Sequence, residues 1–149
     1  MRTIAKIIIC LVSLLIFLSI PGCDLGRKTD RSSEMSYDLL IKELESKGYK
    51  ADKIEPAENE TEHTFFSVFP QYIDINDRRI SVYEFPDTST ADSQAETISE
   101  DGYIIGNAMI DWIDKPHFYK QGRLIVGYAG SDNDLLRSLK AILGEPITK

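Results

Sequence analysis

The residues that could do chemistry gather in one stretch, between positions 111 and 120. This stretch holds the chain's only Trp, one of its two His and two carboxylates, and its candidate residues are Asp111, Trp112, Asp114, His117 and Tyr119. Two carboxylates and an imidazole can ligate a divalent cation, and an imidazole oriented by a carboxylate can act as a general base. A metal-dependent enzyme that uses Asp111, Asp114 and His117 is therefore one hypothesis.

The spacing of these residues favours a structural role for part of the stretch. Side chains of a strand alternate between its two faces, so positions 111 and 114 face opposite ways unless the chain turns between them. Pro116 indicates a turn but does not fix its direction. The simpler interpretation is a strand-end corner with Trp112 and Phe118 in the core and His117 hydrogen-bonded locally. We therefore assign no catalytic residue and no metal ligand, and treat the five candidates as binding residues.

The beginning of the chain has the features of a secretory signal. Arg2 and Lys6 lead into an apolar run from position 7 to position 20, with no acidic residue before Asp24. A helix of that length covers about 21 Å of a hydrocarbon core about 30 Å thick, so it is short for a permanent span. The order of charge and apolar run is typical of a signal peptide. An uncleaved anchor helix is the alternative, which Pro21 and Gly22 disfavour because they break helices.

The apolar run ends in Ile20-Pro21-Gly22-Cys23, which resembles the lipobox of bacterial lipoproteins. Pro21 departs from that family's pattern, which prefers a small or hydroxylated residue there. The resemblance implies a diacylglyceryl group on the Cys23 thiol, cleavage that removes residues 1–22, and acylation of the new amino terminus. We therefore expect a protein anchored to the cell membrane by lipid and facing outside the cytoplasm.

Composition narrows the class of partner. Removal of a leader with two basic and no acidic residues leaves 127 of the 149 residues and takes the net charge from −7 to −9. An acidic surface without a basic, aromatic-rich cluster argues against nucleic acid. No phosphate-binding loop, serine-hydrolase elbow or zinc motif is present, and we expect no cofactor. With Cys10 in the leader and Cys23 lipidated, no thiol is left for a disulfide. Besides the membrane, the expected partner is an unidentified protein or small molecule.

Residues 23–35 are polar and predict a flexible tether, and residues 36–149 predict a single domain. Helical periodicity and caps predict helices over 36–47, over 89–99 with Ser89 as N-cap, and over 132–143 with Ser131 as N-cap. Strands are expected around Ile54 and over 64–69, 72–75, 78–85, 103–113, 117–120 and 123–129. Two-residue turns at Asn76-Asp77 and Gln121-Gly122 would join two hairpins. The first turn pairs Asp74 with Arg79 and Ile73 with Ile80.

This order, α-β-β-β-α-β-β-β-α, predicts an α+β domain: an antiparallel sheet with helices packed mainly on one face. A short echo between residues 44–49 and 98–103 is compatible with two related helix-then-hairpin halves. Such halves would resemble PepSY-like and protease-inhibitor-like architectures, which keeps a secreted inhibitor or regulator open as an alternative function.

The C-terminal half carries a second resemblance. Residues 116–119 read Pro-His-Phe-Tyr, residues 122–126 read Gly-Arg-Leu-Ile-Val, and the last helix ends in Leu143-Gly144 before Pro146. This pattern resembles small bacterial lipoproteins of unknown function, and it implies no activity and no functional residues. Our leading expectation is a membrane-anchored, non-enzymatic binding or interaction module.

Overall fold

The computed structural model describes residues 35–55 and 64–149, so the predicted leader, Cys23 and nearly all of the predicted tether lie outside the described residues. The elements that it describes are α3 (Tyr37–Ser46), β1 (Asp52–Ile54), β2 (Gln71–Asp74), β3 (Arg79–Glu84), α4 (Thr88–Ala95), β4 (Ile104–Ile105), β5 (Ala108–Met109), β6 (Pro116–Gln121), β7 (Leu124–Ala129) and α5 (Asn133–Leu143). The α+β class and the predicted order of elements are confirmed, with the segment 103–113 forming two very short strands. Met35, placed in the tether by composition, is buried in the core.

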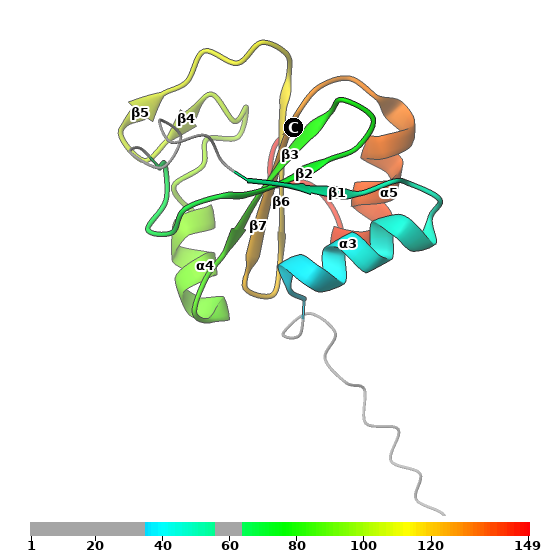
Figure 1. Ribbon diagram of the computed structural model, residues 1–149. Helices are drawn as coiled ribbons and strands as arrows, with labels where there is room; N and C mark the ends of the chain where they lie inside the picture. Colours follow the sequence, from blue (N-terminus) through cyan, green and yellow to red (C-terminus); the bar gives the residue numbers. More distant parts are fainter. Residues whose placement is uncertain (1–34, 56–63) are drawn as a thin grey trace, which may run out of the picture.

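A five-stranded antiparallel sheet forms the centre of the domain, in the order β1-β2-β3-β7-β6 (Figure 1). β4 and β5 pair with each other in a small separate sheet, and Ile105 of β4 also forms an isolated bridge with Ile98. The central strands β3 and β7 come from hairpins that are far apart in the sequence. The pairing of β3 with β7 therefore joins the two hairpins into one sheet. In the part of the chain that the structure describes, no helix has the length and apolar character to cross a membrane.

The first hairpin has the register expected from the sequence. Asp74 pairs with Arg79 and Ile73 with Ile80. Asn76 and Asp77 form the two-residue loop with φ of 53° and 65°, the left-handed conformation that a type I′ turn requires. The turn therefore puts Ile73 and Ile80 on one face of the sheet, where both are buried.

The second hairpin turns one residue later than predicted. Gln121 pairs with Leu124, so the loop is Gly122-Arg123 and not Gln121-Gly122. Gly122 has φ of 56° and stands first in the loop, where a type II′ turn needs glycine. The glycine was the correct signal, but its position within the turn was misassigned.

Both predicted N-caps are wrong. Asp87 caps α4 in place of Ser89, and Asp132 caps α5 in place of Ser131, while Ser36 caps α3, where no cap was predicted. Both carboxylates accept backbone N–H groups and carry a negative charge, which the positive end of a helix favours. In each case an Asp near the Ser takes the capping position.

Residues 64–69 do not form the predicted strand. The hydroxyl of Thr64 donates to the carbonyl of Val68, 2.8 Å away, and accepts from the backbone N–H of Phe66 at 3.4 Å. Local side-chain bonds of this kind compete with sheet pairing. The segment bends, so that Phe66 is buried and Phe65 is exposed.

The sheet separates two apolar clusters. One lies under α3 and α5 and contains Leu40, Leu44, Leu135 and Leu139 with the inward residues of β2, β3 and β7. The other lies under α4 and is rich in aromatic residues, namely Phe66, Tyr83, Phe85 and Phe118. Two of the three described helices thus share a face, as predicted, and Figure 1 shows α4 on the opposite side of the sheet. The two hairpins meet at the β3–β7 pairing, but the helices that precede them, α3 and α4, cover opposite faces.

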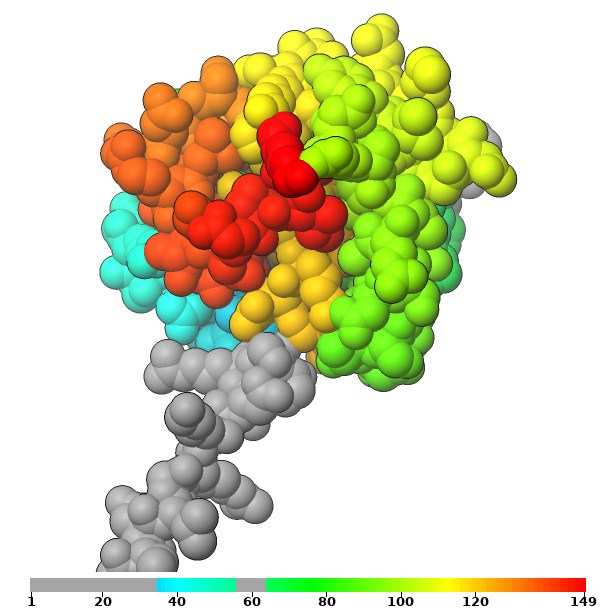
Figure 2. All heavy atoms as spheres, turned by 180° about the vertical axis from the view of Figure 1, so that it is seen from behind, coloured from blue at the N-terminus to red at the C-terminus, as the bar shows by residue number. Residues whose placement is uncertain are grey.

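The last residues of the chain cover the outer edge of β6. The N–H of Ile147 donates to the carbonyl of Phe118 at 2.7 Å, and Tyr119 and Pro146 form an isolated bridge. Thr148 is only 3% exposed, and its hydroxyl accepts from the N–H of Phe118 at 3.1 Å. In Figure 2 this red segment lies across the domain between α5 and the green chain of α4 and the residues after it.

Candidate functional site

A groove lies on the same face of the sheet as α4. α4 covers only one half of this face, and the groove lies in the other half. α4 packs on β6 and β7 near the second hairpin turn, where Lys120 pairs with Asp92. The groove lies at the other ends of these strands. Its volume is about 190 Å³, and its described lining residues are Arg79, Ser81, Tyr83, Trp112, Ile113, Pro116, Phe118, Gly127, Tyr128 and Ala129.

Two small residues side by side create the hollow. Ser81 of β3 pairs with Gly127 of β7, which in turn pairs with Phe118 of β6. The Phe118 ring leans over Gly127 so closely that a Cβ added there would lie 2.9 Å from the ring. The surface of the sheet is therefore recessed at Ser81 and raised at the Phe118 ring. The recessed part forms the floor of the groove, and the Phe118 ring forms one wall.

The segment that was singled out in the sequence contributes Trp112 and Ile113 to the lining of the groove. The Trp112 Nε1–H donates to the carbonyl of Gly102 at 2.9 Å, which fixes the indole. Its ring meets Phe118 and Phe65 edge to face, with ring centroids 5.8 and 6.2 Å apart. Beside it Ile113 is fully exposed and Phe65 is 44% exposed. Among the described residues, the rim of the groove is thus apolar and accessible to solvent.

The floor of the groove carries a row of polar groups along β3. Arg79, Ser81 and Tyr83 alternate along the strand and so share a face. Tyr83 is only 5% exposed, and burial raises the pKa of its hydroxyl well above the ordinary value, so it is a neutral donor. The Arg79 guanidinium lies over the ring of Tyr72, 4.9 Å from its centroid.

His117 and Tyr119 lie on the opposite face of the sheet, toward α5. His117 stacks on Tyr128 with ring centroids 6.4 Å apart. Burial and the charge of Lys115 lower the pKa of His117, while a hydrogen bond with the Gly130 backbone and the charge of Asp114 oppose the shift. Tyr119 is buried, and burial together with Glu145 raises its pKa. Neither side chain reaches the groove beside Trp112.

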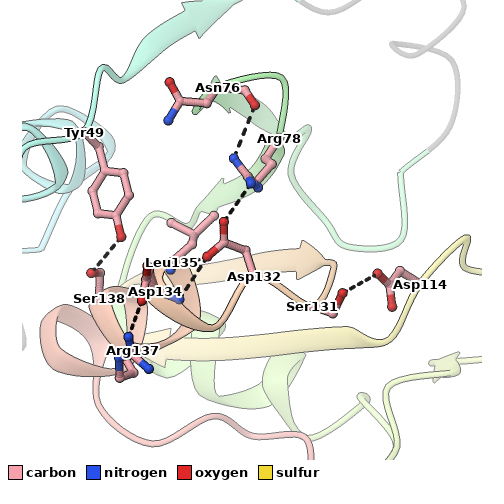
Figure 3. A network of polar contacts seen from close by, with 10 residues as sticks. All are labelled: Tyr49, Asn76, Arg78, Asp114, Ser131, Asp132, Asp134, Leu135, Arg137 and Ser138. Atoms are coloured by element: carbon pink, nitrogen blue, oxygen red, sulfur yellow. Dashed lines mark hydrogen bonds and ion pairs between the residues drawn. The ribbon is translucent and has the colours of Figure 1, made fainter.

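The two carboxylates are also apart. Asp114 accepts from its neighbour Lys115 N–H at 2.7 Å and from the Ser131 hydroxyl at 3.2 Å, and Figure 3 shows Ser131 turned toward it. Asp111 is exposed and borders a separate hollow beside the β4–β5 hairpin. Within residues 35–55 and 64–149, no three His, Cys, Asp or Glu side chains gather as a metal site requires. The set Asp111, Asp114 and His117 does not converge.

The structure therefore brings Trp112 together with residues that sequence reasoning did not single out. Trp112 and Phe118 pack against each other, as the corner interpretation expected, but Arg79, Ser81 and Gly127 complete the groove. The alternation of Arg79, Ser81 and Tyr83 with the buried Ile80 and Val82 was a visible signal for one shared face. What no local pattern could show was the pairing of β3 with β7, which puts Gly127 next to Ser81.

Comparison of the chain with models of protein families, with curated proteins and with solved structures finds no match.

Proposed function

We propose that this protein is a lipoprotein anchored to the outside of the membrane through Cys23, and that its domain is a non-enzymatic binding module. The order of basic residues, short apolar run and Cys23 in a lipobox-like sequence supports the anchor. The groove beside Trp112 is the observation that supports binding. Concave, mostly apolar sites with a few polar groups are where proteins take ligands.

The geometry favours binding over catalysis. The groove combines apolar walls with neutral hydroxyls and one cation. No described lining residue is a carboxylate, imidazole or thiol that could serve as general base or nucleophile. The metal-dependent alternative loses its geometric support, because Asp111, Asp114 and His117 do not gather as three ligands of one ion would.

The position of the groove suits a module that works away from the bilayer. α3 begins at the lower end of the domain in Figure 1, which is where a tether from Cys23 would join it. The β4–β5 hairpin, next to the groove-forming stretch 110–113, lies at the upper end in the same view. A lipid-anchored domain would thus present its groove to molecules that arrive from outside.

The anchor is tested by intact-protein mass spectrometry on material extracted from membranes. We expect loss of residues 1–22 and the added mass of acyl chains, both absent from Cys23→Ser. A retained leader or an unmodified thiol would contradict the anchor and leave the groove to be explained in another compartment.

The groove is tested with toluene, a neutral apolar probe, on the protein in phosphatidylcholine nanodiscs. Trp112 is the chain's only Trp and lines the groove, so a change in its fluorescence that empty nanodiscs do not show reports on this site. We expect a saturable change that Ser81→Leu abolishes, because the added side chain fills the floor. Ser93→Leu, the same change at an exposed position of α4, is the matched control and should bind toluene as before. Equal binding by both variants would count against the groove.

A further inference from the structure

We propose that the β4–β5 hairpin carries a docking surface for another protein, and that this surface takes a segment in which basic side chains alternate with apolar ones. The surface is the hollow beside the hairpin, about 460 Å³ in volume, and its described lining residues are Asp101, Tyr103, Ile104, Met109, Ile110 and Asp111. We call this set the hairpin surface. None of its residues lines the groove beside Trp112, so the inference goes beyond the proposed function.

The hairpin surface exposes apolar side chains that the fold does not bury. Ile104 and Met109 face each other across the two strands and are 41% and 82% exposed. Directly opposite residues of an antiparallel pair share a face. The next residue along β4, Ile105, points to the other face and is buried in the aromatic cluster under α4. One face of the hairpin thus packs on the domain, and the other presents Ile104 and Met109 to solvent.

The residue types of this surface are those that protein interfaces favour. Tyr103 is 41% exposed and lines the same hollow as Ile104 and Met109. Single exposed apolar side chains are common on protein surfaces, whereas groups of them mark contact sites. Tyrosine and methionine are also enriched in interfaces relative to the remaining surface. The grouping therefore favours a protein as the neighbour of this surface.

The only charged groups among the described residues of the hairpin surface are two carboxylates. The N–H of Ile110 donates to the carbonyl of Tyr103 at 2.9 Å, which holds the two chains of the hairpin together above Asp101 and Asp111. The Asp101 carboxylate accepts from the Ser99 hydroxyl at 2.6 Å and from the Tyr103 N–H at 3.1 Å, and these bonds lower its pKa. In the described part of the chain, no Lys or Arg side chain forms an ion pair with either carboxylate. Both negative charges are thus available to a cation from outside.

Charge and position together select the occupant. Arginine and lysine carry a charged head on a long apolar stem, so one side chain can cover apolar surface and still reach a carboxylate. Arginine can also stack on an aromatic ring such as that of Tyr103. Anionic lipid headgroups would meet only like charges here. In Figure 1 the hairpin lies at the upper end of the domain, whereas α3 begins at the lower end, where the proposed anchor would join.

The test is isothermal titration calorimetry of the protein in phosphatidylcholine nanodiscs with three peptides, each acetylated and amidated at its ends. Their sequences are Arg-Leu-Arg-Leu-Arg, Arg-Ser-Arg-Ser-Arg and Glu-Leu-Glu-Leu-Glu. The first has both the charge and the apolar side chains, and each of the others lacks one of these features. We expect the first peptide to bind about tenfold or more tightly than either of the others. Titration of empty nanodiscs measures the heat that comes from lipid.

Met109→Ser tests the apolar part of the surface. Because this side chain is 82% exposed, its loss should leave the fold intact. We expect the affinity for Arg-Leu-Arg-Leu-Arg to fall about fivefold or more and that for Arg-Ser-Arg-Ser-Arg to stay the same. Phe69→Ser is the control, since Phe69 is 57% exposed and does not line the hollow, and it should bind the first peptide as the unchanged protein does.

Asp111→Asn tests the charge of the surface. We expect it to weaken binding of the first peptide about two- to fivefold, an effect that becomes smaller as salt is added. Asp77→Asn is the matched control, because it removes the same charge at an exposed position in the turn of the first hairpin. Unchanged affinity in Asp77→Asn would show that the effect at Asp111 is local and does not come from net charge.

Four results would overturn the inference. They are no binding of the first peptide, equal binding of it and of either other peptide, equal losses in Met109→Ser and Phe69→Ser, and heat that empty nanodiscs reproduce in full. A dimer in analytical ultracentrifugation that Met109→Ser makes monomeric would assign the surface to a second copy of the chain and overturn the basic partner. A Met109→Ser protein that loses the first peptide but keeps the Trp112 response to toluene supports the inference and separates it from the proposed function.

Discussion

The two faces of the central sheet are built in different ways. Under α3 and α5 the contacts are mostly aliphatic, and the helices bring apolar stripes that consist mainly of leucine and isoleucine. On the other face α4 is short, buries a single alanine, and leaves aromatic rings to fill the remaining space. The first face is closed by the chain's own helices, whereas the second is closed only in part, and the groove lies in the part that remains.

The difference follows from what covers each face of the sheet. A sheet face that is filled by helices gains its stability from burial and offers no accessible apolar surface. A face with two small residues, Ser81 and Gly127, in its central strands gives up that burial. Beside this hollow, Ile113 and Phe65 leave apolar side chains exposed to solvent.

The largest effect of a substitution is expected on the face of the sheet that α3 and α5 cover. Leu139 of α5 is fully buried, and Leu139→Ala is expected to lower the free energy of unfolding by about 2–5 kcal/mol, because it leaves a cavity in a rigid core. Chemical denaturation measures the loss. Ile113→Ala at the groove rim should change stability by less than about 0.5 kcal/mol. Similar losses at the two positions would show that the rim is part of the core.

Gly127→Ala tests the packing on the other face of the sheet, which α4 covers only in part. Alanine favours strands more than glycine does, yet the new Cβ would press on the Phe118 ring at 2.9 Å. We expect a loss of about 1–3 kcal/mol in denaturation experiments. The same substitution in a Phe118→Leu background should be nearly free of penalty. A full penalty in both backgrounds would show that crowding by the ring is not the cause.

Thr148→Val tests the edge that the chain's end covers. Valine keeps the shape of the side chain but cannot accept from the Phe118 N–H, which leaves a buried donor unpaired. We expect a loss of about 1–2 kcal/mol, read from the midpoint of urea unfolding. Thr97→Val removes a hydroxyl bond at an exposed site and should have almost no effect. Equal effects would mean that burial of Thr148 adds nothing.

The smallest expected effect is the pH dependence at His117. Folding lowers the pKa of this ring from its ordinary 6.5, so the folded state favours the neutral form. Stability is therefore full above pH 6.5 and falls as the pH drops through 6.5 to the folded pKa, because the unfolded chain takes up the proton more readily. His117→Gln should make the melting temperature less sensitive between about pH 7.5 and pH 5. An unchanged slope would contradict the shift.

Local chemistry was readable from the sequence, and long-range pairing was not. Asn76-Asp77 fixed the register of the first hairpin because both residues tolerate positive φ. Asp87 and Asp132 were missed as caps because a serine lies within two residues of each and can take the same role. For the candidate site, Trp112 was identified by its chemistry. Its partners Ser81 and Gly127 were not, because they meet only when two distant hairpins pair.

The covered edge of β6 has a consequence for how the protein reaches its final shape. Strand β7 supplies the centre of the sheet, and residues 146–148 seal its border, so the two structures on which the sheet depends come late in the chain. A polypeptide threaded amino end first through a membrane channel could not complete this sheet while its tail was still inside. Local elements such as the β2–β3 hairpin could form earlier, but the five-stranded sheet would be complete only after residues 124–148 had emerged.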